Sequence, residues 1–322
     1  MLKKYIFKKL IIFIAFLFSI MLIYITPSSE YQFKNTLNYI DNSETCSIYL
    51  LDSNNYVALT KIKIKNKKIE NKAKELLNAL IKGGSKEEDI PSGFKSIISS
   101  ETKINALKYE NGIIKIDLSS ELLDINKDYE EKMIEAIVYT LTSIEGVDKV
   151  IIYVDGDILT YLPKSGVYLP STLDKTYGIN KEYSLSSYKD VDKVTVYYVS
   201  SYNDTNYYVP VTKYINNKDN KIKIIIDSLS SSNISNTNLM SYLNSNTVLL
   251  SSDIEDDLMK LVFNQYIFND LSTKNILEEV IETISLSIKA NYDVKEVVFD
   301  VNNEEIYKSV IKSTWNLLKF VI

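Results

Sequence analysis

The sequence predicts an α+β protein made of two tandem modules, each with the element order ββαββαββ, behind an N-terminal apolar segment. Three observations predict this class. Short apolar or alternating runs bounded by turn residues indicate strand hairpins, and longer segments carry apolar residues at helical spacing. The order of these elements recurs along the 322 residues, a length that suits about two domains. We therefore expect helices packed on mostly antiparallel sheets.

The first 26 residues predict a cytoplasmic Lys cluster and a transmembrane signal anchor. Four Lys residues between positions 3 and 9 precede an apolar run over residues 10–25, which only Ser19 interrupts. With the apolar residues just before it, this stretch reaches about 20 residues, enough to cross a bilayer as a helix. The Lys cluster places the rest of the chain outside the cytoplasm. A cleavable signal peptide is the alternative, although residues 24–27 offer a poor cleavage site.

A polar linker over residues 27–45 leads to the first module, expected over residues 46–183. Its expected elements are strands 47–51 and 56–64, a helix over 68–81, strands 103–109 and 113–118, a helix over 129–143, and strands 149–154 and 158–162. Asn111-Gly112 is typical of a type I′ hairpin turn, and Asp155-Gly156 suits the next turn. Gly83-Gly84 ends the first helix in a common way.

The second module, expected over residues 191–312, repeats this order in divergent form. Its expected elements are strands 193–199 and 207–214, a helix over 221–229, a strand over 259–263, a helix over 275–289 and a strand over 294–299. At an offset of 147 residues three apolar helix positions coincide, namely Ile134 with Ile281, Ile137 with Ile284, and Leu141 with Ile288. A repeat of this length indicates a duplicated domain. The alternative is chance similarity between two amphipathic segments. The apolar tail over residues 313–322 is a packing helix or a partner-binding segment.

The composition removes several kinds of catalysis. The chain has no His, all 37 of its basic residues are Lys, and Cys46 is the single cysteine. A His-based general base, a Ser-His-Asp triad, an arginine finger and a His-ligated metal cannot be built from this chain alone. One thiol also excludes a disulfide within the monomer. We expect a protein that is not an enzyme.

The charge argues against nucleic acid as a partner. The formal net charge is −5, with 37 bases and 42 acids. Residues 1–26 hold four Lys and no acid, so the remaining chain has 33 bases against 42 acids and a net charge of −9. A nucleic-acid-binding domain should instead carry a basic face.

Candidate sites are few, and each has a structural alternative. Ser92-Gly93-Phe94-Lys95, Tyr109-Glu110-Asn111 and Lys164-Ser165-Gly166 resemble the three boxes of penicillin-binding enzymes. Pro91 and Gly93 instead indicate a loop, whereas a nucleophilic Ser of this class begins a helix. We therefore expect no catalytic residue and no cofactor.

Acidic and aromatic residues give two more candidates. Asp117, Glu121 and Asp155-Gly156-Asp157 could supply oxygen ligands to Ca²⁺, but a hairpin turn and a capped helix start explain them better. Tyr197-Tyr198 and Tyr207-Tyr208 could stack on cell-wall sugars, or simply reflect the preference of Tyr for strands. We expect no metal-binding or cofactor-binding residue.

Four segments of the first module resemble the GerMN domain of sporulation and spore germination proteins. They are residues 77–84 (LNALIKGG), 90–93 (IPSG), 111–119 (NGIIKIDLS) and 150–156 (VIIYVDG). The resemblance covers residues 46–183 well and extends more loosely to about residue 312. It implies a fold similar to the ring-building motifs of secretion systems. It also implies a membrane-anchored extracytoplasmic protein needed for sporulation and germination, in the channel complex between mother cell and forespore.

The sequence departs from this pattern in two places. The resemblance implies a lipoprotein, but Ser43-Glu44-Thr45 before Cys46 is not a lipobox, so we expect a transmembrane anchor in place of lipidation. The second module lacks the IPSG and Asn-Gly signals and has Asp256-Asp257 where the hairpin turn should be.

Two functional hypotheses remain. The first is a non-enzymatic assembly protein in the cell membrane, with a single span and most of the chain extracytoplasmic, that associates with itself or with other sporulation channel proteins. The second is a module that binds peptidoglycan or a small molecule of the envelope.

Overall fold

The computed structural model describes residues 44–216, 220–230, 238–301 and 304–310. The predicted transmembrane anchor, all but the last two residues of the linker, and the apolar tail lie outside these residues. Among the described helices none is long and apolar enough to cross a membrane.

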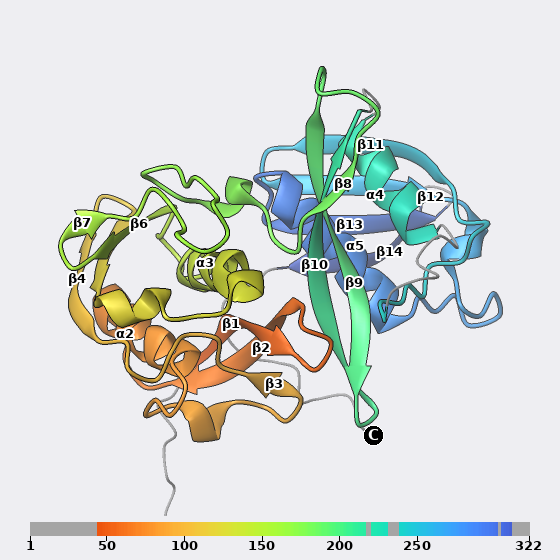
Figure 1. Cartoon of the computed structure of the whole chain (residues 1–322). Coiled ribbons are helices and arrows are strands. Elements are labelled where there is room, and N and C mark those ends of the chain that lie inside the picture. The colour runs from red at the N-terminus through yellow and green to blue at the C-terminus, as the bar shows by residue number, and fades with distance from the viewer. Residues whose placement is uncertain (1–43, 217–219, 231–237, 302–303, 311–322) are drawn as a thin grey trace, which may run out of the picture. The chain divides into compact units, whose positions relative to one another are not determined.

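The first module contains the predicted elements in the predicted order (Figure 1). They are β1 (Glu44–Asp52), β2 (Val57–Ile64), α2 (Ile69–Leu80), β3 (Phe94–Lys95), β4 (Ile104–Glu110), β5 (Ile113–Leu118), α3 (Lys127–Leu141), β6 (Lys149–Val154) and β7 (Asp157–Ile158), with 3₁₀ turns at Glu87–Asp89, Ser120–Leu123 and Lys175–Tyr177. The strand predicted over 158–162 is wrong beyond residue 158. The chain there bends back on itself, with backbone hydrogen bonds from Leu162 to Val167 and from Leu169 to Thr160, and the Glu130 carboxylate on α3 accepts the N–H groups of Lys164 and Ser165 in the bend.

The second module repeats these elements after a short connecting strand, β8 (Glu182–Ser184). They are β9 (Asp192–Tyr202), β10 (Thr205–Ile215), α4 (Lys221–Ser230), β11 (Leu249–Glu255), β12 (Leu258–Phe263), a 3₁₀ turn at Gln265–Ile267, α5 (Glu278–Asn291), β13 (Glu296–Val301) and β14 (Glu304–Val310). Asp256-Asp257 keeps the hairpin turn, since Asp256 adopts a φ of 51°. In both modules the carbonyl oxygen of the second turn residue accepts hydrogen bonds from the two residues where the next strand of the sheet, β6 or β13, begins. Asp148 and Lys149 donate to Gly112 O, and Lys295 and Glu296 donate to Asp257 O.

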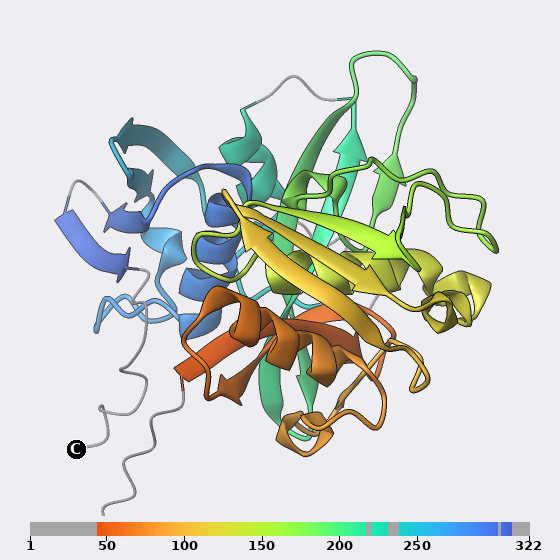
Figure 2. The same cartoon turned by 90° about the vertical axis from the view of Figure 1, so that its left-hand side faces the viewer.

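The strands form three sheets within the described residues (Figures 1 and 2). Each module has its own four-stranded sheet, in the orders β4-β5-β6-β7 and β11-β12-β13-β14. The third sheet has six strands and contains the opening hairpins of both modules, β1-β2 and β9-β10. The mostly antiparallel pairing is confirmed, with parallel pairs at β5-β6, β12-β13 and β8-β10. The sharing of one sheet by both modules was not predicted, and it arises because the opening hairpins pair with each other.

Helices α3 and α5 lie in the core of their modules. The paired positions that the repeat predicted are buried in both helices, with Ile137, Leu141, Ile284 and Ile288 fully inaccessible to solvent. Each helix packs on the first strand of its opening hairpin, α3 on β1 and α5 on β9. The duplicated apolar pattern therefore builds two equivalent cores.

Candidate functional site: the junction between the modules

The two opening hairpins meet at strands β2 and β10, which run antiparallel. Tyr208 of β10 lies opposite Leu59 of β2. Two residues further along β10 stands Pro210, which has no N–H to donate and so cannot continue the ladder. Asn180 fills this gap. Its side chain accepts the Val57 N–H (2.9 Å) and donates to both the Val57 and the Pro210 carbonyl oxygens (2.8 Å each).

The connection between the modules holds Asn180 in place. Its backbone adopts a φ of 45°, a left-handed conformation that Asn tolerates better than most residues. Its N–H donates to Oε2 of Glu135 on α3 (2.9 Å), and the preceding N–H, of Ile179, donates to Oγ1 of Thr212 on β10 (3.0 Å). The connection is therefore bonded to elements of both modules.

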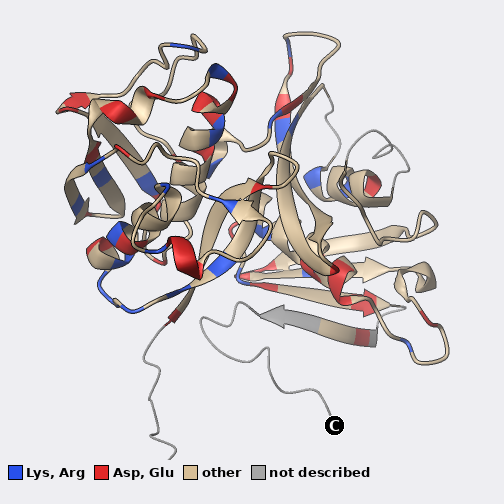
Figure 3. Cartoon of the chain, turned by 60° about the horizontal axis from the view of Figure 1, so that its bottom comes forward, with Lys and Arg blue, Asp and Glu red and all other residues tan. Residues whose placement is uncertain are grey.

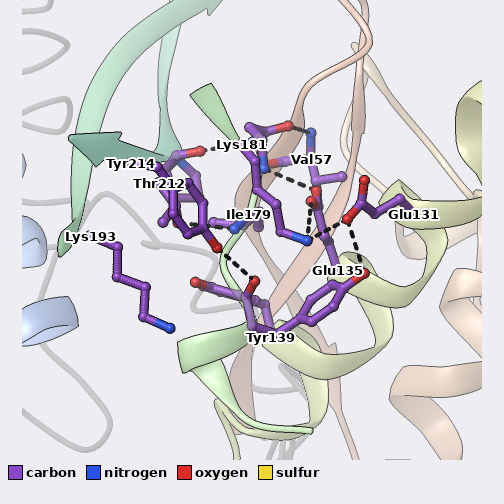
Figure 4. Close-up of polar contacts among 12 residues, drawn as sticks. Val57, Glu131, Glu135, Tyr139, Ile179, Lys181, Lys193, Thr212 and Tyr214 are labelled. Carbon is purple, nitrogen blue, oxygen red and sulfur yellow. Dashed lines mark hydrogen bonds and ion pairs between the residues drawn. The ribbon is translucent and has the colours of Figure 1, made fainter. Parts of the chain in front are cut away.

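A cluster of charged and aromatic side chains surrounds this connection (Figure 4). The ammonium of Lys181, whose side chain is 8% exposed, pairs with Glu131 and lies 3.9 Å from Oε1 of Glu135. It also sits 3.5 Å from the ring centroid of Tyr177, whose hydroxyl donates to Glu131 (3.1 Å). Burial raises the pKa of Glu135 to about 7, because the Asn180 N–H and the more distant Lys181 only partly offset its desolvation.

Two equivalent tyrosines meet at the same junction. The hydroxyls of Tyr49 and Tyr197 lie 2.9 Å apart. Tyr49 is the strand partner of Leu59 in the first hairpin, and Tyr197 is the partner of Pro210 in the second. Burial raises the pKa of Tyr49 to about 12 and also raises that of Tyr197, so both hydroxyls stay protonated at neutral pH. The contact between equivalent residues gives the junction a local two-fold character.

A buried carboxylate adds a further link. Asp52, at the end of β1, is inaccessible to solvent and accepts the N–H groups of Asn54 and Tyr56 with Oδ1 (2.8 Å each). Its Oδ2 accepts the hydroxyl of Tyr207 from β10 (2.9 Å). The Asp52 carboxylate therefore binds both the turn of the first hairpin and the second module.

The outer edges of the opening hairpins are closed by helix side chains in both modules. Oγ1 of Thr140 on α3 accepts the Tyr49 N–H (3.0 Å), and Oγ of Ser287 on α5 accepts the Tyr197 N–H (2.8 Å). One turn later, Asn291 bonds further backbone groups of β9. The repeat therefore preserves a polar contact as well as the apolar core.

The tyrosine platform considered from the sequence is wrong for three of its four residues. Tyr197, Tyr198 and Tyr207 are 4%, 2% and 7% exposed. Their rings belong to the core and the junction, and cannot stack on a sugar.

The acidic candidates serve the hairpin turn, as the structural alternative predicted. Asp155 and Gly156 adopt positive φ angles of 49° and 89°. Asp117 accepts the Gly156 N–H (3.1 Å), and Asp155 accepts the N–H of Ser120 (3.1 Å) at the start of a 3₁₀ turn. The carboxylates of Asp117 and Asp155 therefore bind backbone N–H groups of this turn and of Ser120, which follows β5 and Ser119.

Ser92 and the box Lys164-Ser165-Gly166 lie in loops. Ser92 precedes the two-residue strand β3 and does not begin a helix. The backbone of Lys164 and Ser165 is bound to Glu130, and the Lys164 ammonium donates to the Ile125 carbonyl (2.7 Å). These residues hold a loop in place.

The sequence interpretation missed the junction. Asn180, Lys181 and Glu135 carry no motif, and Asn180 reaches partners 123 and 30 residues away. One signal was available. Pro210 interrupts a predicted strand, and Pro within a sheet marks an edge or a break in pairing.

Charged residues of both signs are interspersed over the helices and strands of both modules (Figure 3). Several of these charges pair with one another, for example Lys72 with Glu44 and Lys260 with Asp300.

A family model described as sporulation and spore germination matches two stretches, residues 47–160 and 195–307. The chain belongs to this family. The stretches span β1–β7 and β9–β14, so the junction residues 179–184 fall between the two matches. The family assignment confirms the resemblance found in the sequence.

A relative in this family agrees with the assignment both in sequence and in a solved structure. The spore germination protein GerM of Bacillus subtilis (strain 168) is 32% identical over 262 residues, covering 80% of this chain and 71% of GerM. The solved structure of the tandem GerMN domains of the sporulation protein GerM from Bacillus subtilis matches with a TM-score of 0.73 and 31% identity. That match covers 81% of this chain and 92% of the solved chain. The tandem GerMN architecture is therefore shown.

Proposed function

We propose that this chain is a non-enzymatic assembly protein of sporulation. In this proposal it is anchored in the cell membrane by residues 10–25, with the modules outside the cytoplasm. It works in the channel complex between mother cell and forespore and is needed for spore formation and germination. Its partners are further copies of itself or other proteins of that complex.

The junction is the observation that carries the assembly role. Asn180, Asp52 and the Tyr49–Tyr197 pair each make hydrogen bonds that link the two modules. Side chains engaged in this way fix the geometry of the joint. A protein whose buried polar groups hold two modules together suits the role of a scaffold.

Family membership supports the sporulation role, and the sequence supports the anchor. The Lys cluster before the apolar run favours an orientation in which residues 27–322 lie outside the cytoplasm.

The proposal is tested by deleting the gene in the organism that encodes the chain and counting heat-resistant spores. We expect a loss of heat-resistant spores that the full chain restores. A deletion strain that sporulates and germinates normally would contradict the sporulation role.

A second experiment tests the mode of action. Fractionation of sporulating cells should place the chain with the membrane, and purified cell wall should not retain it at high salt. Retention that survives high salt would instead favour a peptidoglycan-binding module.

A further inference from the structure

The two modules differ at one edge of their four-stranded sheets. β4 is the edge strand of the first module and β11 is the edge strand of the second. Both begin with a bulge, at Asn105 and Leu250, and both end at a two-residue turn. Equivalent positions in the two strands are therefore 145 residues apart.

The edge of the first module is occupied by its own side chains. Glu70 on α2 accepts the Tyr109 N–H (3.0 Å), and the Tyr109 hydroxyl donates to the Gly146 carbonyl (2.9 Å). The amide of Asn105 donates to Asp155 (3.4 Å). Helix contacts and polar side chains of this kind protect a sheet edge from pairing with another chain.

The edge of the second module carries exposed apolar side chains instead. Leu250 and Ile254 stand where the first module has Asn105 and Tyr109, and they are 57% and 48% exposed. Val248, just before the strand, is 51% exposed. The Ile254 N–H is held by the neighbouring carboxylate of Asp253 (3.0 Å) and not by a helix. We call Val248, Leu250 and Ile254 the apolar edge.

We propose that β11 pairs in antiparallel fashion with β11 of a second copy of this chain, about a two-fold axis at Ser252. The pairing joins two four-stranded sheets into one. It supplies the self-association that is one of the two modes of assembly in the proposed function, on which this inference rests. The ladder geometry permits it. Glu255 and Leu258 close the hairpin, so Asp253 and Ser251 pair with β12, and the N–H groups of Ser252 and Ile254 point away from the sheet.

The sequence of β11 is complementary to itself in this arrangement. Residues two before and two after Ser252 face each other, which places Leu250 of each copy opposite Ile254 of the other. Glu255 and the two Asp residues of the turn form an acidic end. Antiparallel pairing puts the two acidic ends at opposite sides of the interface, whereas parallel pairing would bring like charges together.

The chain already contains a joint of the same kind. Strands β2 and β10 are equivalent elements of the two modules, and they pair in antiparallel fashion. This module therefore joins a second copy of itself through a strand edge within one chain. The β11 pairing extends that mode to a second chain, with the same patch on both copies as a two-fold contact requires.

The test uses the purified full chain, kept dispersed in detergent, with Cys46→Ser to remove the native thiol. Ser252→Cys places a thiol on the proposed axis, where paired Cα atoms lie about 5.5 Å apart, within the range of a disulfide. The matched control is Leu107→Cys, at the equivalent position of β4. On mild oxidation we expect a covalent dimer from the Ser252→Cys chain and monomer from the control.

Adding Leu250→Lys and Ile254→Lys to the Ser252→Cys chain should abolish the dimer. Both side chains are about half exposed, so the fold should survive, and unchanged circular dichroism checks this. Equal amounts of covalent dimer from the Ser252→Cys and Leu107→Cys chains would overturn the proposed pairing. A covalent dimer that persists with the two Lys substitutions would overturn it as well.

Failure of this inference differs from failure of the proposed function. A Ser252→Cys chain that stays monomeric removes the β11 pairing and leaves the deletion phenotype untouched. A deletion strain that sporulates normally removes the sporulation role and leaves the cross-linking result in place.

Discussion

Asn180 shows how much a single side chain contributes at the junction. One amide bonds two carbonyl oxygens and one N–H on strands from both modules. Pro210 creates the need for this bridge, because the β10 backbone has no donor there. The bridge replaces a missing rung of the six-stranded sheet.

The change Asn180→Ala should lower the free energy of unfolding by about 2–3 kcal/mol. The substitution leaves three backbone groups without partners, and an unsatisfied buried group costs about 1–3 kcal/mol. Urea denaturation of the full chain measures the difference.

The matched control for Asn180→Ala is Asn203→Ala. Asn203 has nearly the same backbone conformation, with a φ of 47°, but is exposed in the β9–β10 turn. The change in the free energy of unfolding of Asn203→Ala therefore measures the backbone strain alone. Equal destabilisation by the two variants would contradict the bridging role of Asn180.

Glu135 should make stability depend on pH. Burial raises its pKa to about 7, so between pH 4.5 and 7 the folded chain holds a proton that the unfolded chain releases. The contribution of Glu135 to the free energy of unfolding is therefore largest below about pH 4.5 and falls as the pH rises to 7. The shift corresponds to about 3 kcal/mol.

The change Glu135→Gln should flatten this part of the profile. An amide oxygen can still accept the Asn180 N–H, and an amide does not titrate. Thermal unfolding of the parent chain and the variant between pH 4.5 and 8 measures the effect. Glu88→Gln, which replaces an exposed acid, is the control. A Glu135→Gln profile parallel to that of the parent would show that Glu135 does not titrate in this range.

At the scale of elements, helix side chains close the edges of β1 and β9. The changes Thr140→Ala and Ser287→Ala should each cost about 1–2 kcal/mol, because each leaves the N–H of a buried tyrosine without an acceptor. Ser285→Ala is the control. Ser285 lies on the same helix and is 2% exposed, but its hydroxyl makes no hydrogen bond within the described residues.

We expect Ser285→Ala to be neutral or stabilising, because it removes a buried polar atom without a partner. Chemical denaturation of the three variants gives the comparison. If Ser287→Ala is as harmless as Ser285→Ala, the contact between α5 and β9 does not stabilise the module.

The elements that local patterns determine were predicted well. Helices α3 and α5 followed from apolar spacing, and the β4–β5 hairpin followed from Asn111-Gly112. The repeat also predicted the second set of buried helix positions. These features depend on residues close in sequence.

The arrangement of sheets could not be predicted in this way. The pairing of β2 with β10 joins residues far apart in the chain, and nothing in either strand specifies its partner. The contacts of Asn180, Lys181 and Glu135 arise only once that pairing exists. Pro210 marked a break in a strand, but the residue that would fill the break had no signature.

At the scale of the whole molecule, the six-stranded sheet couples the two modules. Strands of both belong to it, and buried bonds such as Tyr49–Tyr197 cross between them. The core amides of β5 and β12 should therefore exchange with solvent through one global opening, with free energies within about 1 kcal/mol of each other. Hydrogen exchange followed by mass spectrometry measures both. A lower value in one module alone would mean that the modules unfold independently.

The central claim is that this chain acts in sporulation by assembly. Two full chains with different tags, co-expressed in sporulating cells and cross-linked there, test it most directly. We predict that recovery of one tag brings down the other, and that Leu250→Lys with Ile254→Lys in both chains abolishes this recovery. The claim would be contradicted if the tagged chain were recovered alone, with neither the differently tagged copy nor any other envelope protein of the sporulating cell.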